Sequence, residues 1–431
     1  MSKYLGFYIL VISIMSCVSP ASTFTKIPPG IWRGTLLLDR VPVQTYGDDR
    51  DIVKKFDTES ELPFNFEVIY EDEINFYIVI HNGKERIEVR DIQYGTDRST
   101  AKDTIIIDFP IYDTQIRAIY EDGVMEGDWI VNYRDGYSIP FKAIHGVSDR
   151  FTSISKNKPA MVAGKWASTF EIGTADEYPA LGVFTQQSDT LWGTFLTETG
   201  DYRYLEGKVI DQKFYLSTFD GAHAFMFLGK ILADGTITGT FRSGSQYTTS
   251  WEARRTDKSN LKSMDELTKP NSSSALTLQL PDLEGNLVDI NDIKYAGKPK
   301  IIQIMGTWCP NCMDESLFLA EYMKANPDRD VLVFTVGFER YEDKEKSISV
   351  LNKFKNRMNI THPILYGGYY DKNVASSVFP QLSEIISYPT TIFLDRNNKV
   401  YKVHTGFNGP ATTEYEAFKK TFNEIVNQIS K

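Results

Sequence analysis

Between residues 24 and 256, short apolar runs alternate with turn-forming dipeptides. The clearest runs cover residues 64–70, 75–81, 104–109, 214–219 and 224–228. The dipeptides are Asn82-Gly83, Asp122-Gly123, Asp135-Gly136, Asp220-Gly221 and Asp234-Gly235, and such pairs favour tight hairpins. No long amphipathic helical pattern is visible in this region. The pattern therefore predicts an antiparallel β-rich half, folded as a barrel or a sandwich.

The β-rich half also contains an internal repeat. Residues 30–36 and 164–170 both fit Gly-x-Trp-x-x-Thr-apolar, and later Gly-aromatic pairs recur near residues 127–129 and 239–241. These matches predict two related modules, at 24–152 and 160–256. The alternative is one irregular sandwich in which the Gly-Trp pairs coincide by chance.

Residues 275–431 show a different, mixed pattern. Apolar strands are expected at 276–280, 287–290, 300–305, 331–336, 390–394 and 400–404. Helices are expected from Cys309 to about 325 and at about 341–358, 374–386 and 412–430. This order predicts an α/β domain whose mixed sheet is covered on both faces. The polar residues 257–274 before it read as a linker with a short helix at 261–267.

The sequence Trp308-Cys309-Pro310-Asn311-Cys312 lies between a predicted buried strand and a predicted helix. The helix N-terminus offers unpaired N–H groups and a positive dipole end, which favour a thiolate at Cys309. Cys312 lies on the same helical face and can form a disulfide with Cys309. A zinc site would need more ligands, and a peroxidase would carry its Thr one position earlier than Thr307. We therefore expect Cys309 to be the nucleophile and Cys312 the resolving thiol.

Residues 275–431 resemble the thioredoxin-like family, and within it the TlpA/ResA-type disulfide reductases of the bacterial envelope. The resemblance rests on residues 306–312, on Tyr388-Pro389-Thr390-Thr391, and on Glu315, three residues after the second cysteine. The segment 338–386 fits the helical insertion of that family. The whole chain also resembles envelope lipoproteins of Bacteroidetes-like bacteria, in which a β-rich half precedes such a domain.

The resemblance implies roles for residues around the cysteines. Glu315 would take the proton of Cys312; alternatively it is an acid that suits the first turn of the helix. Pro389 would be cis and would bring the backbone of Tyr388 against the disulfide, or else it makes an ordinary trans turn. Trp308 would shield the cysteine pair, and Trp308, Tyr388 and Pro389 would contact the substrate.

The N-terminus predicts export. Residues 1–22 contain an apolar run of signal-peptide length that ends at Ser16-Cys17, which resembles a lipobox. Cys17 would then be lipidated and followed by a flexible tether, and the body of the protein would lie in the periplasm as a lipid-anchored lipoprotein. An uncleaved signal anchor is the alternative. With three cysteines in total, no structural disulfide framework is possible, and a net charge of −10 argues against nucleic acid as a partner.

A polar stretch in the second module, residues 193–204 and 217–224, has two interpretations. It could bind a ligand or present a partner to the redox site. The favoured interpretation is two hairpins whose Asp, Thr and Gly residues form turns, with His223 paired to a neighbour. The remaining histidines show no spacing typical of metal ligands.

These patterns together predict a thiol-disulfide oxidoreductase of the bacterial cell envelope that reduces protein disulfides. Its redox-active disulfide, Cys309–Cys312, would need no other cofactor and no metal. Its partners would be protein disulfides, an upstream membrane electron donor, and the membrane through the lipid anchor. The alternative is a binding or scaffold lipoprotein whose β-rich half carries the main function, with the redox pair as a switch. An oxidase or isomerase with the same chemistry is a third possibility.

Overall fold

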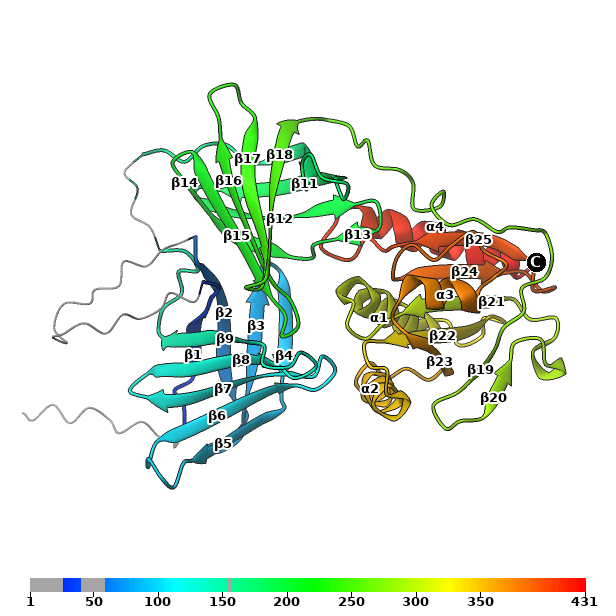
Figure 1. The fold of residues 1–431 in the computed structure, drawn as a ribbon, viewed down its shortest axis with the longest axis horizontal. Helices are drawn as coiled ribbons and strands as arrows, with labels where there is room; N and C mark the ends of the chain where they lie inside the picture. Colours follow the sequence, from blue (N-terminus) through cyan, green and yellow to red (C-terminus); the bar gives the residue numbers. More distant parts are fainter. Residues whose placement is uncertain (1–25, 40–58, 153–154, 156) are drawn as a thin grey trace, which may run out of the picture.

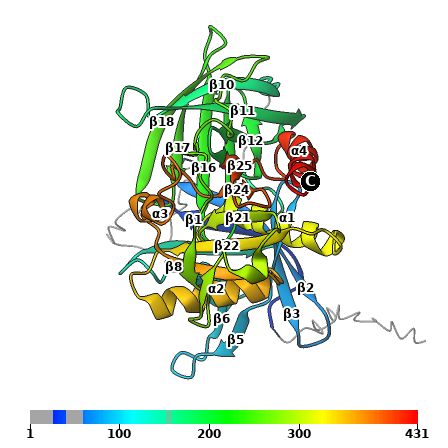
Figure 2. The same cartoon turned by 90° about the vertical axis from the view of Figure 1, so that its right-hand side faces the viewer.

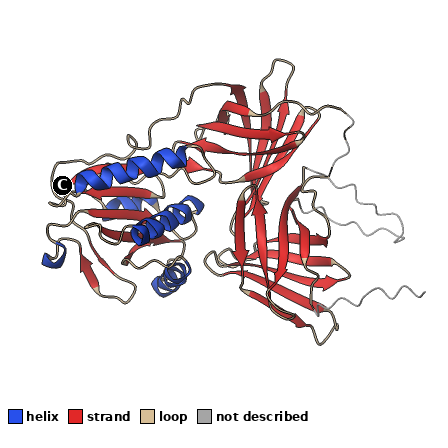
Figure 3. Cartoon of the chain, turned by 180° about the vertical axis from the view of Figure 1, so that it is seen from behind, coloured by secondary structure: helices blue, strands red, loops and turns tan. Residues whose placement is uncertain are grey.

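A computed structural model describes residues 26–39, 59–152, 155 and 157–431. The predicted signal peptide and Cys17 lie outside these ranges. The described chain forms three bodies: an open β-sheet, a closed β-barrel and an α/β domain (Figure 1, Figure 3). No helix in the described ranges has the length and apolar character needed to span a membrane.

The first body is one antiparallel sheet of nine strands. Its order is β4-β3-β2-β1-β9-β8-β7-β6-β5, so β4 and β5 form the two edges. The strands are β1 (Gly30–Leu37), β2 (Glu61–Tyr70), β3 (Phe76–Asn82), β4 (Glu85–Val89), β5 (Ile92–Thr96), β6 (Asp103–Phe109), β7 (Thr114–Glu121), β8 (Val124–Val131) and β9 (Ser138–His145). Alternate side chains of β3, β6 and β9 are buried in a shared apolar core, as expected for a sheet with one covered face, whereas consecutive side chains of β1 and β2 are buried.

The second body is a closed barrel. The order β11-β10-β18-β17-β16-β15-β14-β12 is completed by pairing of β11 with β12. The strands are β10 (Gly164–Phe170), β11 (Tyr178–Gln187), β12 (Thr190–Thr197), β13 (Gly200–Asp201), β14 (Leu205–Ile210), β15 (Lys213–Phe219), β16 (Ala224–Ile231), β17 (Ile237–Ser243) and β18 (Tyr247–Arg255). The prediction of an antiparallel β-rich half is confirmed, and its second part is a barrel, not a sandwich.

The repeated motif begins both β bodies in the same way. β1 pairs with β2 and β9, and β10 pairs with β11 and β18. The indole Nε1 of Trp32 donates to the carbonyl of Pro28 at 3.2 Å, and that of Trp166 donates to Val162 at 2.8 Å. Both tryptophans are buried. This shared local structure supports two related modules.

The third body is the predicted α/β domain. Its five-stranded sheet has the order β23-β22-β21-β24-β25, in which β22 and β23 run parallel to β21 and β24 runs antiparallel. The elements are β19 (Gln279–Pro281), β20 (Leu287–Asp289), η1 (Ile293–Tyr295), β21 (Lys300–Met305), α1 (Pro310–Ala325), β22 (Leu332–Glu339), α2 (Lys344–Arg357), β23 (Ile364–Tyr369), α3 (Lys372–Val378), β24 (Thr390–Leu394), β25 (Val400–Thr405) and α4 (Glu414–Ile429).

Helices cover both faces of this sheet, as Figure 2 shows from the side of the domain. Ile301 on β21 and Val333 on β22 pack with α1 and α4. Their neighbours Ile302 and Phe334 point the other way and pack with α2 and α3. This alternation follows from the two-residue period of a strand. The predicted thioredoxin-like arrangement is confirmed.

Two expected helices were wrong, and one strand was not expected. The helix expected at 374–386 is α3, which ends at Val378, because Pro380 disfavours helical geometry at Phe379. Residues 364–369 form the parallel strand β23, which was not predicted. No helix forms at 261–267, where the chain makes a turn.

Candidate active site

The two active-site cysteines lie at the junction of β21 and α1. Cys309 is the N-cap of α1 and Pro310 is its first residue, where a missing N–H costs nothing. Cys309 and Cys312 form a disulfide with a Cα–Cα distance of 5.2 Å. The backbone N–H of Cys312 donates to the Cys309 Sγ at 3.3 Å. The helix N-terminus therefore directs a hydrogen-bond donor at the sulfur that would carry the thiolate charge.

The turn before β24 contacts the disulfide. The Tyr388–Pro389 peptide bond is cis. The carbonyl oxygen of Tyr388 lies 3.5 Å from the Cys309 Sγ. The Tyr388 hydroxyl donates to the carbonyl of Tyr370 at 3.0 Å, which fixes the ring. The turn thus brings a backbone acceptor to the Cys309 sulfur.

Trp308 is held beside the cysteine pair. Its indole Nε1 donates to the Phe338 carbonyl at 3.0 Å. Its ring packs edge-on against Tyr370 and Tyr388, each at a centroid distance of 5.4 Å. The Arg340 guanidinium lies 5.0 Å from the ring centroid, a cation–π distance. These contacts hold the half-buried indole in one orientation.

Glu315 is buried one turn beyond Cys312 on α1, with 1% of its surface exposed. Its carboxylate accepts hydrogen bonds from the Gln303 amide at 2.9 Å and from the Thr391 hydroxyl at 2.8 Å. Burial raises the pKa of Glu315 to about 7, although both hydrogen bonds act to lower it. The structure thus supplies a carboxyl group on the helix of the cysteines that exchanges a proton near neutral pH.

A second buried carboxyl group, Glu339, was not predicted as a site residue. It ends β22 and accepts hydrogen bonds from the backbone N–H of Thr307 at 3.0 Å and from its hydroxyl at 2.8 Å. Burial raises the pKa of Glu339 to about 7. The carboxyl ends of adjacent parallel strands meet at one sheet edge, so this acid at the end of an apolar strand could have been noticed from the sequence.

The β-rich half packs over the start of α1 and forms a cover beside the disulfide. Cys309 is 5% exposed, and Ile111, from the turn between β6 and β7, belongs to the same buried apolar cluster as Cys309 and Met313. On the barrel side, Gly200 forms a bridge with Phe407 and its backbone lies against the Asn311 side chain. A bulkier residue at position 200 would collide with Asn311. The β-rich half therefore borders the helix start that carries Cys309.

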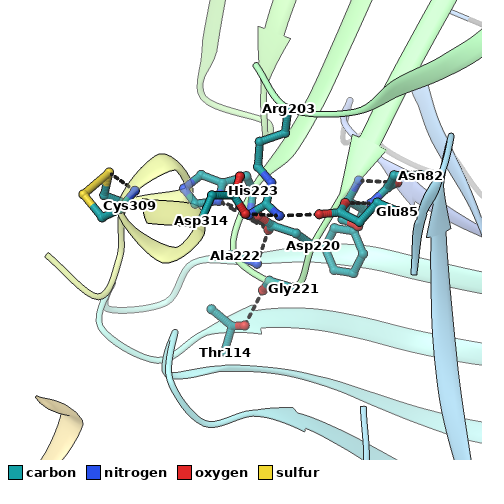
Figure 4. Close-up of polar contacts among 12 residues, drawn as sticks. Asn82, Glu85, Thr114, Arg203, Asp220, Gly221, Ala222, His223, Cys309 and Asp314 are labelled. Atoms are coloured by element: carbon teal, nitrogen blue, oxygen red, sulfur yellow. Dashed lines mark hydrogen bonds and ion pairs between the residues drawn. A yellow bond between two sulfur atoms is a disulfide. The ribbon is translucent and has the colours of Figure 1, made fainter. Parts of the chain in front are cut away.

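A buried ionic cluster joins all three bodies next to α1. Arg203 of the barrel forms ion pairs with Glu85 of the open sheet and with Asp314 of α1, the latter at 3.2 Å (Figure 4). All three side chains are about nine-tenths buried. Burial raises the pKa of Asp314 to about 7, against the attraction of Arg203. Asp314 was not predicted as a contact residue, since its partners are distant in sequence.

The polar stretch of the barrel is both a set of turns and part of this interface. His223 pairs with Asp220 at 3.0 Å, which agrees with the turn interpretation. In the same stretch, the Asp201 carboxylate accepts from the backbone N–H of Gly409 in the α/β domain at 2.7 Å. Among the described residues, no group of three His, Cys, Asp or Glu side chains could hold a metal ion.

Comparison with known proteins gives a consistent result for the C-terminal domain. Residues 268–419 match the redoxin family. Thiol-disulfide oxidoreductase ResA of Geobacillus thermodenitrificans is 31% identical over 134 residues, which cover 31% of this chain and 68% of that protein. Thioredoxin-like protein YneN of Bacillus subtilis is 28% identical over 127 residues, which cover 30% of this chain and 66% of that protein.

A solved thiol:disulfide interchange protein of the thioredoxin family from Chlorobium tepidum matches 38% of this chain and 98% of its own, with 17% identity and a TM-score of 0.29. The chain spans about two thirds of the length of the curated relatives. The β-rich residues before 268 lie outside the family match. Through its C-terminal domain, which carries the Cys309–Cys312 pair, the chain belongs to the thioredoxin-like thiol-disulfide oxidoreductases of the ResA type.

Proposed function

We propose that this protein reduces protein disulfides in the bacterial cell envelope. The observation that carries the proposal is the Cys309–Cys312 disulfide at the N-terminus of α1, with the Tyr388 carbonyl beside Cys309. In the reduced protein, the Cys309 thiolate attacks a substrate disulfide and releases one substrate thiol. A mixed disulfide between Cys309 and the other substrate sulfur remains. Cys312 then attacks the Cys309 sulfur and releases the second thiol.

The reaction transfers two electrons to the substrate and leaves the Cys309–Cys312 disulfide. A dithiol donor, proposed to be an upstream membrane protein, returns the pair to the reduced state. Glu315 acts as the base that takes the proton of Cys312, since its carboxyl group exchanges a proton near pH 7. Trp308, Tyr388 and Pro389 form the surface against which the substrate segment lies.

A trapping experiment tests this function. In a Cys312→Ala variant the mixed disulfide at Cys309 cannot be resolved, so mass spectrometry of the native envelope should recover substrate proteins bonded to Cys309. A Cys309→Ala, Cys312→Ala variant is the control and should recover none. Recovery of no partner above that control, or a measured reduction potential near −120 mV, would contradict a reductase.

We propose the cellular location and the domain boundaries of the protein from its sequence. Cys17 anchors the protein by lipid, the modules lie at 24–152 and 160–256, and the linker covers 257–274. A Cys17→Ala variant should leave the membrane fraction, with Cys309→Ala as the control that stays bound. Limited proteolysis should cut first within 257–274. Retention of the Cys17→Ala variant in membranes would favour an uncleaved signal anchor.

One observation favours a second candidate function. Because the β-rich half packs against the start of α1 beside Cys309, the redox pair could act as a switch inside a binding or scaffold lipoprotein. Replacing both cysteines separates the two functions. If partner binding and phenotype survive without the thiols, the protein is not primarily an oxidoreductase.

A further inference from the structure

A polar pocket of about 470 Å³ lies between the barrel and the active-site loops. It is lined by Tyr178, Pro179, residues 197–202, Asn311, Ser387 and Tyr388. Two of these residues adjoin the disulfide directly. Asn311 follows Cys309 by two positions, and the Tyr388 carbonyl lies 3.5 Å from the Cys309 Sγ. The pocket therefore opens beside the reactive sulfur, and its outer wall belongs to the barrel.

The barrel wall of the pocket is fixed to the α/β domain. Gly200 bridges to Phe407, and the Gly409 N–H donates to Asp201. Within the turn, the Thr197 hydroxyl donates to the Gly200 carbonyl at 3.0 Å. The volume is within the range of pockets that bind small ligands or a few residues of a peptide, about 300–1,000 Å³. It is too small for a folded domain, so it would receive an extended segment.

The charged residues that line the pocket are all acidic. Its lining contains Glu198 and Asp201 and no Lys, Arg or His. Asp201 is occupied, because it accepts from the backbone N–H groups of Gly409 and Arg203. Glu198 accepts the backbone N–H of Lys262 at 3.4 Å and forms a loose ion pair, at 3.9 Å, with the exposed side chain of the same residue. The basic side chain of a ligand can replace the exposed Lys262 ammonium group, so Glu198 is the pocket carboxylate that a charged ligand can reach.

Asn311 supplies an independent sign of a ligand. Its side chain is 8% exposed and its Oδ1 has no hydrogen-bond partner among the described residues. A buried acceptor without a donor is unfavourable, and native structures contain few of them. The backbone N–H of an extended peptide is a donor of suitable size and reach. Asn311 thus points to a peptide ligand at the same pocket that Glu198 lines.

We propose that this pocket binds the residues flanking the substrate cysteine and selects segments that carry a basic residue next to it. Asn311 Oδ1 accepts a backbone N–H of the segment, and Glu198 pairs with the basic side chain. The barrel turn 197–202 is then a specificity-determining part of the enzyme. This inference rests on the proposed disulfide reductase function.

The test uses the pre-reduced full chain in single-turnover reactions with two disulfide-linked peptides. The peptides differ only in carrying Lys or Glu immediately before the cysteine. We expect the Lys peptide to react at lower concentration, with about a three- to fivefold lower apparent dissociation constant and a similar limiting rate. Glu198→Gln should abolish this preference, and Glu198→Lys should reverse it.

Two controls make the outcome decisive. Glu252→Gln changes an exposed acid of β18 outside the pocket and should keep the preference. The uncharged disulfide bis(2-hydroxyethyl) disulfide should react equally with all variants. If the preference is absent in the native protein, or survives Glu198→Gln, the specificity proposal is wrong. If the uncharged disulfide does not oxidise Cys309 and Cys312 at all, the proposed function itself fails.

Discussion

Two buried carboxyl groups, Glu315 and Glu339, distinguish the α/β domain at the scale of single residues. Both are 1% exposed, and burial raises the pKa of each to about 7. Their hydrogen bonds differ. Glu315 is held by side chains of β21 and β24, whereas Glu339 is held by Thr307 in the loop before Cys309. We therefore expect Glu315 to act on proton transfer and Glu339 to act mainly on stability.

Changing Glu315 to Gln should slow the resolving step. Gln keeps the size of the side chain, and it can accept from the Gln303 amide while donating to the Thr391 hydroxyl. It cannot take the proton of Cys312, so resolution of the mixed disulfide should fall about 100-fold. The pH dependence of this step should lose its inflection near 7. Stopped-flow measurement of substrate release from pH 5 to 9 checks both effects. An unchanged rate and pH profile would mean that Glu315 only complements the positive end of the helix dipole.

Changing Glu339 to Gln should stabilise the protein above pH 7. The native carboxyl group must ionise in a buried site there, and the amide remains neutral, so we expect a gain of about 1–3 kcal/mol at pH 8. At pH 5 folded Glu339 is protonated and the unfolded carboxyl group has only begun to ionise, so the two proteins should differ by less than about 1 kcal/mol. Urea unfolding at both pH values measures the difference. Glu345→Gln, an exposed acid on α2, is the control and should change nothing.

At the scale of elements, α1 is held by contacts from both β bodies. Arg203 crosses from the barrel to Asp314, and Ile111 packs against the start of the helix. A second set of ion pairs between the open sheet and α2 includes Arg357 with Asp91 at 2.6 Å, but it is well exposed. The buried and the exposed pairs that join the β-rich half to the α/β domain should therefore contribute very differently to stability.

Changing Arg203 to Met should loosen the cover over the disulfide. Asp314 and Glu85 would be left buried without a cation, at a cost of about 3–5 kcal/mol. Alkylation of Cys309 in the reduced protein, followed by mass spectrometry, should then be at least about tenfold faster. Arg357→Met removes an exposed pair between the same halves and should change the rate less than about twofold. Equal effects of the two variants would contradict the role given to the buried cluster.

The turns and the short active-site motifs were predictable because neighbouring residues in the sequence determine them. All five Asp-Gly and Asn-Gly dipeptides lie where one strand connects to the next. The cysteine pair, Glu315 and the cis bond before Pro389 could be expected from short motifs. β23 was missed because Gly367 and Gly368 interrupt its apolar pattern, as glycines do in many turns. The helix expected at 374–386 extends beyond the end of α3, because Pro380 disfavours helical geometry at the preceding residue.

The contacts across bodies could not be predicted from local patterns. Arg203 and Asp314 are more than a hundred residues apart, and only the packing of three sheets brings them together. The cover over Cys309 likewise depends on a turn of the first module. Sequence periodicity describes which face of an element is buried but does not say against which distant partner.

At the scale of the whole molecule, buried carboxyl groups should dominate the pH dependence of stability. Burial raises the pKa of Asp201 to about 6 and those of Asp314, Glu315 and Glu339 to about 7. The folded protein therefore binds more protons than the unfolded chain between about pH 4.5 and pH 7, and stability should fall as the pH rises through that window. Urea unfolding at pH 5 and pH 8 checks this, and a higher stability at pH 8 would contradict it.

The cover over Cys309 has a further consequence because it belongs to the same chain as the disulfide. Residues 256–278 connect β18 to β19, so the β-rich half stays near α1 at any protein concentration. Such a tethered group acts as a competing ligand with an effective concentration on the order of millimolar. Dilution cannot weaken it. Under the proposed function, a substrate segment therefore either enters the pocket beside Cys309 or competes with this tethered half.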